Sequence, residues 1–163
     1  EISECLVGSE MCIRDRFETT PDGGRMEAVL DSAYAGVRMR RSLSLEKSVL
    51  TDRFVCESED EHVYDYTLIL RDPVALSAAQ CDTLPEYGRI SQVTKATGKG
   101  DCRFELRDGT GLALHVNGPY DLYTGVAPGI PPKGLEPGED VYPLILRTKG
   151  KKMEVEVTWE LVD

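Results

Sequence analysis

Strict alternation of apolar and polar residues is the feature that most constrains how this chain of 163 residues can fold. The clearest run covers residues 36–46, where every second residue from Val37 to Leu45 falls on one side of an extended chain. Side chains of a β-strand point alternately to opposite faces, so this pattern predicts a strand with one buried and one solvated face. Arg41 is the exception, because its spacing places a charged side chain on the apolar side.

Further short strands follow from the same pattern and from the turn residues between them. They are predicted at residues 26–30, 48–56, 63–70, 90–97, 102–107, 112–116, 120–126, 141–147 and 153–161. Residues 108–111 predict a hairpin turn, residues 149–152 the turn of a closing hairpin, and residues 73–80 one or two helical turns. Residues 125–140 are rich in proline and glycine and predict a loop. Many short strands joined by turns indicate an all-β fold, an antiparallel β-sandwich.

The charge balance and the cysteines narrow the range of partners. A net charge of −10 argues against general binding of nucleic acid. No stretch approaches the roughly 18 apolar residues of a membrane span, so no membrane partner is expected. Cys56, Cys81 and Cys102 show no C-x-x-C spacing, which disfavours a zinc knuckle, and we expect buried free thiols rather than a disulfide.

The first sixteen residues resemble a translated transposon-type sequencing adapter. The codons CTC GTG GGC TCG GAG ATG TGT ATA AGA GAC encode residues 6–15 without a mismatch. We therefore expect residues 1–16 to be an artefact without native structure. Residues 17–163 are then expected to be a fragment of a larger protein from a metagenomic source, so the lack of a signal peptide carries no information.

The two histidines are candidates for chemistry. In a strand, His62, Tyr64 and Tyr66 share one face and Asp65 lies on the other, so His62 and Asp65 do not converge on one metal ion. His62 among carboxylates and tyrosines could act in catalysis or binding, but a structural role is favoured for both His62 and His115. No serine–histidine–aspartate set and no phosphate-binding loop can be recognised.

Two other groups of side chains could bind sugars. Six cations could form a basic patch for sugar acids, although solvated strand faces and a turn are the favoured interpretation. They are Arg38, Arg40, Arg41, Lys149, Lys151 and Lys152. Four aromatic residues could stack on sugar rings or fill the core, and the core is favoured for the tryptophan. They are Tyr120, Tyr123, Tyr142 and Trp159.

Four motifs follow one another along the chain. They are Gly36-Val-Arg-Met-Arg-Arg-Ser-Leu-Ser-Leu, Leu50-Thr-Asp-Arg-Phe-Val, His62-Val-Tyr-Asp-Tyr-Thr-Leu, and Thr124-Gly-Val-Ala-Pro-Gly followed by Pro143-Leu-Ile-Leu-Arg-Thr-Lys-Gly-Lys-Lys. In this order they resemble the patterns G-V-x-x-x-R-x-L-x-L, L-x-D-x-F-x-V, H-x-Y-D-Y-x-x-H and P-x-x-x-R-x-K-G-x-x-A-x-F. These patterns belong to the C-terminal β-sandwich domain of the heparinase II/III-like polysaccharide lyases, which include oligoalginate lyases. The resemblance spans residues 26–161.

The resemblance implies an enzyme that pairs an α/α toroid with the sandwich and cleaves uronic-acid polysaccharides by β-elimination. In the family a tyrosine and histidines or an asparagine of the cleft perform this chemistry, and most of them lie upstream of the region matched here. Some relatives hold a structural zinc, with one ligand a histidine that ends the strand of the third motif. Here residues 67–71 contain no histidine, so neither a metal nor a cofactor is expected. The resemblance also implies a periplasmic or secreted location.

The sequence therefore predicts a C-terminal, non-catalytic β-sandwich fragment of a polysaccharide lyase, inactive on its own. Its expected partners are the toroid of the same chain and an acidic polysaccharide. No catalytic residue is assigned, and His62, Tyr64 and Tyr123 are the candidate substrate-binding residues. One alternative is a free-standing carbohydrate-binding sandwich, which needs an exposed row of rings such as Tyr120, Tyr123 and Tyr142. The other is a cell-surface structural domain.

Overall fold

The computed structural model describes residues 16–129 and 139–160. Within these ranges every regular element is a β-strand, and all paired strands run antiparallel. The strands are β1 (Arg16–Thr20), β2 (Gly23–Tyr34), β3 (Val37–Glu46), β4 (Val49–Leu70), β5 (Gln80–Cys81), β6 (Ser91–Lys99), β7 (Cys102–Glu105), β8 (Gly111–Val116), β9 (Pro119–Pro128) and β10 (Asp140–Glu160). The prediction of an all-β, antiparallel sandwich is confirmed. Across the same ranges no helix is long and apolar enough to cross a membrane.

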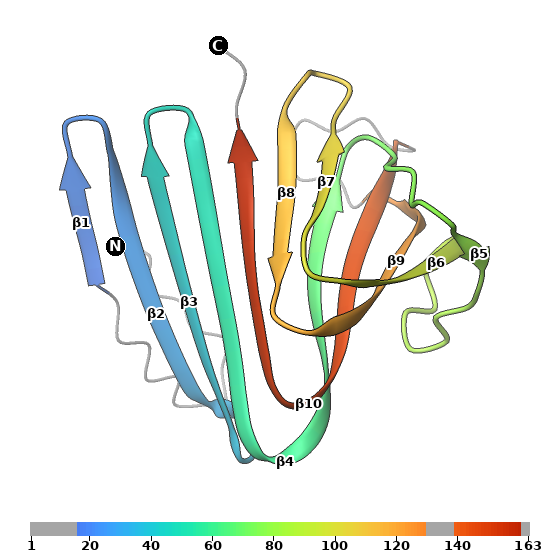
Figure 1. The fold of residues 1–163 in the computed structure, drawn as a ribbon, viewed down its shortest axis with the longest axis horizontal. Coiled ribbons are helices and arrows are strands. Elements are labelled where there is room, and N and C mark those ends of the chain that lie inside the picture. Colours follow the sequence, from blue (N-terminus) through green and yellow to red (C-terminus); the bar gives the residue numbers. More distant parts are fainter. Residues whose placement is uncertain (1–15, 130–138, 161–163) are drawn as a thin grey trace.

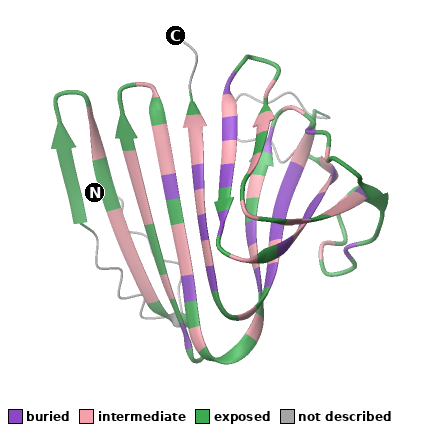
Figure 2. Ribbon diagram, viewed as in Figure 1, coloured by how far each residue is buried: buried purple, intermediate pink, exposed green. Residues whose placement is uncertain are grey.

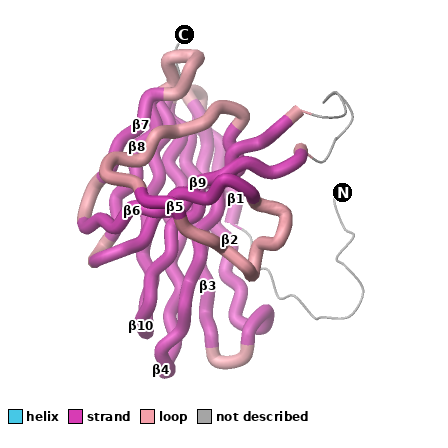
Figure 3. The backbone as a smooth tube through the Cα atoms, turned by 90° about the vertical axis from the view of Figure 1, so that its right-hand side faces the viewer, coloured by secondary structure: helices cyan, strands magenta, loops and turns pink. Residues whose placement is uncertain are grey.

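Two long strands, β4 and β10, belong to both layers of the sandwich (Figure 1). They pair along almost their whole length, residues 49–57 with 152–160 and residues 62–70 with 142–150. The first of these halves continues into β3, β2 and β1 on one side and β8 and β7 on the other, which makes the first layer. The second half continues into β9, β6 and β5, which complete the second layer. Figure 3 shows these three strands passing in front of the first layer.

The corner between the layers shows that the closing hairpin predicted at residues 149–152 is wrong. Instead of turning back, β10 runs on through a β-bulge between Gly150 and Lys152, where Gly150 has a φ of 154°. The bulge reverses the alternation of the strand. Even-numbered residues such as Leu144 face the central core before the bulge, and odd-numbered residues such as Val155 face it afterwards. A break in alternation beside Lys-Gly-Lys-Lys is equally typical of a turn, which is why the sequence pattern favoured a hairpin.

Strand β4 likewise joins the two strands that were predicted at residues 48–56 and 63–70. The mostly acidic residues 57–61 between them are largely exposed at the bend rather than forming a loop. The predicted strand at 36–46 is confirmed as β3, and the hairpin of β7 and β8 is confirmed, with Gly109 at a φ of 87° in its turn. The helical turns predicted at 73–80 are wrong. This segment is irregular, and it is anchored by Val74 and Leu76, whose side chains each pack against the main core.

The main core lies between the two layers, and Figure 2 shows the buried residues gathered in β4, β8, β9 and β10. Both layers contribute side chains that are almost fully enclosed, including Leu112, Leu114, Leu144, Leu146, Met153, Val155 and Val157. A smaller core covers the opposite side of the second layer. There the connection between β5 and β6, residues 82–90, which we call the strap, packs over the layer. The buried residues of this smaller core are Leu84, Val93, Tyr123 and Ile145.

A buried polar contact links the layers beside the main core. Asp52, only 3% exposed, accepts a hydrogen bond of 2.6 Å from the Tyr66 hydroxyl. The Arg41 guanidinium donates to both oxygens of the same carboxylate, at 3.0 and 3.2 Å from Nε and 2.6 Å from Nη2. Burial and the neighbouring carboxylate raise the pKa of Tyr66, so the phenol keeps the proton that it donates. Arg41 sits on the apolar side because it neutralises a carboxylate buried there.

We expect Tyr66→Phe to lower the free energy of unfolding by about 2 kcal/mol, because it leaves a buried carboxylate without one of its donors. Tyr64→Phe is the matched control: this tyrosine is also buried in β4, but its hydroxyl lies 3.5 Å from the carbonyl oxygen of Lys151, at the limit of a hydrogen bond. Its loss is expected to stay below about 1 kcal/mol. Urea unfolding measures both changes, and equal losses would contradict a special role for the Asp52 contact.

Candidate functional site

A charged groove of about 180 Å³ runs over the outward face of the first layer. Its cations come from four strands, and they are Arg25, Arg38, Arg40, Arg53 and Lys152. Its carboxylates are Glu27, Glu57 and Glu154. Five positive and three negative side chains give this surface a local charge opposite to that of the whole chain, whose net charge is −10.

The pairing of the strands explains why these residues meet. On the outward face Arg38 stands opposite Glu57, and Glu57 stands opposite Lys152 on the next strand. One row along, Arg40 stands opposite Val55, which in turn faces Glu154. Neighbouring strands lie about 4.8 Å apart, so the first row forms a continuous strip of charged side chains, whereas Val55 separates the two charges of the second row.

The carboxylates of the groove are held mainly on its β10 side. Glu154 accepts a hydrogen bond from Arg53, and Lys152 Nζ lies 3.2 Å from Glu154 and 3.3 Å from Glu57. The Arg53 and Lys152 side chains lower the pKa of the Glu154 carboxyl, which is therefore ionised at neutral pH.

On the β2–β3 side the ion pairs are looser. Arg25 and Arg40 each approach Glu27 only to 3.7 Å, beyond hydrogen-bond distance. Within residues 16–129 and 139–160, no carboxylate lies within 4.0 Å of Arg38. These three guanidinium groups therefore keep donors that face solvent.

The groove contains only half of the basic patch that the sequence suggested. Arg38, Arg40 and Lys152 lie in it. Arg41 lies half exposed on the inward side of the first layer, where it pairs with Asp52, and Lys149 stands opposite Val63 in the second layer. Sequence analysis missed Arg25, which preceded the predicted strand 26–30, and Arg53, whose neighbours depend on strand pairing that alternation does not reveal.

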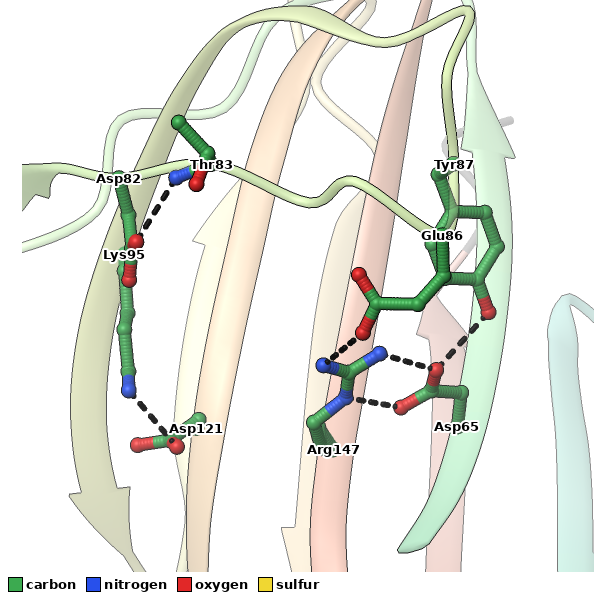
Figure 4. Close-up of polar contacts among 8 residues, drawn as sticks. All are labelled: Asp65, Asp82, Thr83, Glu86, Tyr87, Lys95, Asp121 and Arg147. Atoms are coloured by element: carbon green, nitrogen blue, oxygen red, sulfur yellow. Dashed lines mark hydrogen bonds and ion pairs between the residues drawn. The ribbon is translucent and has the colours of Figure 1, made fainter.

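A second polar cluster fastens the strap to the second layer (Figure 4). Arg147 donates to both oxygens of Asp65 at 2.7 Å and to Glu86 of the strap at 2.8 Å. The Tyr87 hydroxyl of the strap donates to Asp65 at 2.9 Å. Asp65 and Glu86 raise the pKa of Arg147 above its ordinary value. This clamp, defined as Arg147, Asp65, Glu86 and Tyr87, holds the strap in place.

The three candidate substrate-binding residues do not meet at one site. His62 and Tyr64 share a face as expected, with ring centroids 5.9 Å apart, and Tyr64 is buried between the layers. Tyr123 lies on the opposite face of the second layer, buried under the strap. Its ring is flanked by Lys95 at 5.3 Å and by the Arg147 guanidinium at 5.5 Å.

The other aromatic candidates and the possible metal ligands do not form a binding site among the residues that the structure describes. Tyr120 is buried in the main core, and Tyr142 and Trp159 pack against it, so these rings do not form an exposed row. His115 Nδ1 lies 2.9 Å from Asp101 on the surface. In the described part of the chain, no group of three or more histidine, cysteine or acidic side chains is arranged to hold a metal.

The cysteines only partly follow the expectation of buried free thiols. All three are free, Cys56 is buried, and Cys102 is partly buried. Burial raises the pKa of the Cys56 thiol to about 11, which keeps it protonated and unreactive. Cys81 is exposed, because it lies in the short edge strand β5.

An apolar face remains uncovered on β1, β2 and β3. These strands extend beyond the second layer, as Figure 1 shows, and their inward side continues the surface that forms the core. Phe17, Met26 and Leu45 on this side are 72%, 43% and 39% exposed. Contiguous exposed apolar surface of this kind typically marks a place where another domain or protein packs. We call it the uncovered apolar face.

Comparison with known proteins identifies the fold. No protein-family model and no curated protein matches the sequence. A solved heparinase III matches with a TM-score of 0.56 and 10% identity, over 96% of this chain and 22% of that chain. Heparan sulfate lyase HepC from Pedobacter heparinus matches with a TM-score of 0.55 and 13% identity, over 92% and 22%. A 4-alpha-glucanotransferase from Thermococcus litoralis matches with a TM-score of 0.53 and 8% identity, over 91% and 22%. The chain thus spans 22% of the length of each of these proteins.

We expect Asp65→Asn to loosen the strap, because one carboxylate binds both Arg147 and Tyr87. Hydrogen exchange at the strap amides of Tyr87 and Ile90, which are bonded within the strap, should become about tenfold faster, as the loss of roughly 1.4 kcal/mol implies. Asp72→Asn is the control, because Asp72 lies outside the strap and pairs with the exposed Arg107 at 3.4 Å. Equal exchange in both variants would exclude the clamp as the anchor.

The same clamp gives the strap a pH dependence. Glu86's own backbone amide and the Arg147 guanidinium lower the pKa of the Glu86 carboxyl. Its contribution to strap attachment is therefore fully present above its ordinary pKa of 4.5 and is lost as the pH falls through the lowered value. Strap exchange, corrected for intrinsic rates, should rise on acidification in the wild type and rise less in Glu86→Gln.

Proposed function

We propose that the chain is the C-terminal, non-catalytic β-sandwich of a polysaccharide lyase that cleaves uronic-acid-containing polysaccharides by β-elimination. The observation that carries this proposal is the match of nearly the whole chain to 22% of a heparinase III and of a heparan sulfate lyase. The order of four family-like motifs from Gly36 to Lys152 supports the same assignment. We further propose that the parent enzyme works in the periplasm or outside the cell.

The fold alone does not select this function. The glucanotransferase match means that a sandwich of this kind also occurs in a protein named for different chemistry. The motifs are what favour the lyase. The free-standing carbohydrate-binding alternative gains no support from Tyr120 and Tyr123, because both rings are buried and unavailable for stacking on a sugar.

A non-catalytic role is supported by the burial of Tyr64, one of the three candidate substrate-binding residues. β-Elimination needs a base and an acid that reach the substrate from an open cleft. Tyr64 is buried, and burial raises the pKa of its phenol, so it is a poor base. His62 stands beside it, at the corner of β4 between the layers.

The uncovered apolar face is where we propose that an α/α toroid of the same protein packs. Phe17, Met26 and Leu45 would be buried by such a domain, and the face continues directly into the core of the sandwich. Each apolar side chain removed from water there stabilises the contact by roughly 1 to 2 kcal/mol. The sandwich would then support the cleft while the toroid supplies the chemistry.

The chain alone should produce no unsaturated ends from alginate or heparan sulfate, measured by ultraviolet absorbance. Produced together with the polypeptide encoded directly upstream in its gene, it should produce them from at least one uronate polysaccharide. Product formation by the chain alone contradicts the non-catalytic role. An upstream sequence of repeated sandwiches instead of a helical toroid contradicts the lyase and favours the structural domain.

Met26→Asp should abolish co-purification with that upstream polypeptide, because it places a charge in the middle of the uncovered apolar face. Ile69→Asp is the matched control, since Ile69 is 62% exposed on the outward side of the second layer. Loss of co-purification by both variants, or by neither, would show that the partner does not pack against β1 to β3.

A further inference from the structure

We propose that the charged groove on the outward face of the first layer is a binding site for an anionic polysaccharide, distinct from any catalytic cleft. The groove lies on the side of the first layer opposite the core and opposite the uncovered apolar face. It stays accessible when a domain packs on that apolar face. The inference therefore does not rest on the proposed function.

The first argument is the supply of free donors. Arg25, Arg38 and Arg40 line the β2–β3 side, and their nearest carboxylate contacts are 3.7 Å or absent among the described residues. A guanidinium is a planar fork that binds a carboxylate or sulfate through two parallel hydrogen bonds. Arg38 and Arg40 are two residues apart on one strand, which places their Cα atoms roughly 6.7 Å apart on a rigid sheet.

The second argument is the supply of acceptors. Glu154 and Glu57 are held in position by Arg53 and Lys152, yet a carboxylate has more lone-pair sites than these contacts use. Ionised carboxylates can accept hydrogen bonds from sugar hydroxyls while the arginines donate to acidic groups. A uronic acid or sulfated sugar presents both kinds of group on each ring, so it matches the mixed lining of this groove.

The third argument excludes other ligands. Nucleic acid carries one charge per roughly 1.7 Å of duplex. A chain of net charge −10 repels any polyanion at long range, so net charge does not decide between nucleic acid and an anionic glycan, and the kinds of side chain in the groove do. Proteins that bind single strands without sequence preference add aromatic rings on which bases stack. The described residues that line the groove include no such ring. Neutral glycans would leave the free arginine donors without anionic partners.

The test measures binding of heparan sulfate and alginate oligosaccharides to the intact chain by titration calorimetry. The wild type is compared with the double variant Arg38→Ser/Arg40→Ser. A second double variant, Arg103→Ser/Arg107→Ser, is the control. The control pair removes the same charge from the first layer and the turn beside it, where Arg103 pairs with Glu160 and Arg107 with Asp72. Circular dichroism and urea unfolding check that all three proteins are folded.

We expect saturable binding of at least one anionic glycan, weakened at least tenfold by Arg38→Ser/Arg40→Ser and less than twofold by the control pair. Dextran, a neutral glycan, should not bind. Absence of saturable binding to either anionic glycan overturns the proposal. So does equal weakening by both double variants, or binding of single-stranded DNA that is as tight as that of the glycan. Lyase assays play no part in these outcomes, so the site can fail or succeed independently of the enzyme assignment.

Discussion

The hydrogen bond from Tyr66 to Asp52 joins two residues of a single strand across the interior of the sandwich. In a straight strand, fourteen residues span roughly 45 Å, so this contact exists only because β4 bends back between them. The carboxylate it uses is almost fully buried, and Arg41 supplies the charge that makes its burial tolerable. This group of three side chains stabilises the contact between the layers and the bend of β4, and it explains why one arginine lies on an apolar face.

Alternation predicted most of the strands and their faces, including β3 and the β7–β8 hairpin, because it is a local property of the chain. Alternation also marked Arg41 as an exception, but it did not reveal Asp52 as the partner. The register between β3 and β4 cannot be deduced from the sequence of either strand alone. The same limit hid the charged groove, which is assembled from four strands by their register. The corner at Gly150 was mistaken for a turn because a bulge and a turn both interrupt the pattern.

The two sides of the first layer have opposite chemistry, and each suits a different kind of partner. The inward side is apolar, partly covered by the second layer and uncovered on β1 to β3, which suits another folded domain. The outward side carries arginines with free donors between anchored carboxylates, which suits a hydrated anionic chain. Neither side requires the sandwich to perform chemistry. In our two proposals, the β-domain connects a catalytic partner to a polymeric substrate without containing the reacting groups itself.

The bulge in β10 has a genetic consequence. Because it reverses the alternation between Leu144 and Val155, both halves of the strand present apolar side chains to one core. Loss or gain of a single codon near Gly150 would turn one half of the strand inside out, exposing its leucines or valines and burying its charges. Surface loops elsewhere tolerate changes of length, but this corner does not tolerate the insertion or deletion of an odd number of residues. We therefore expect homologous genes to preserve whether the number of residues between these two positions is even or odd, even where every side chain in the corner has changed.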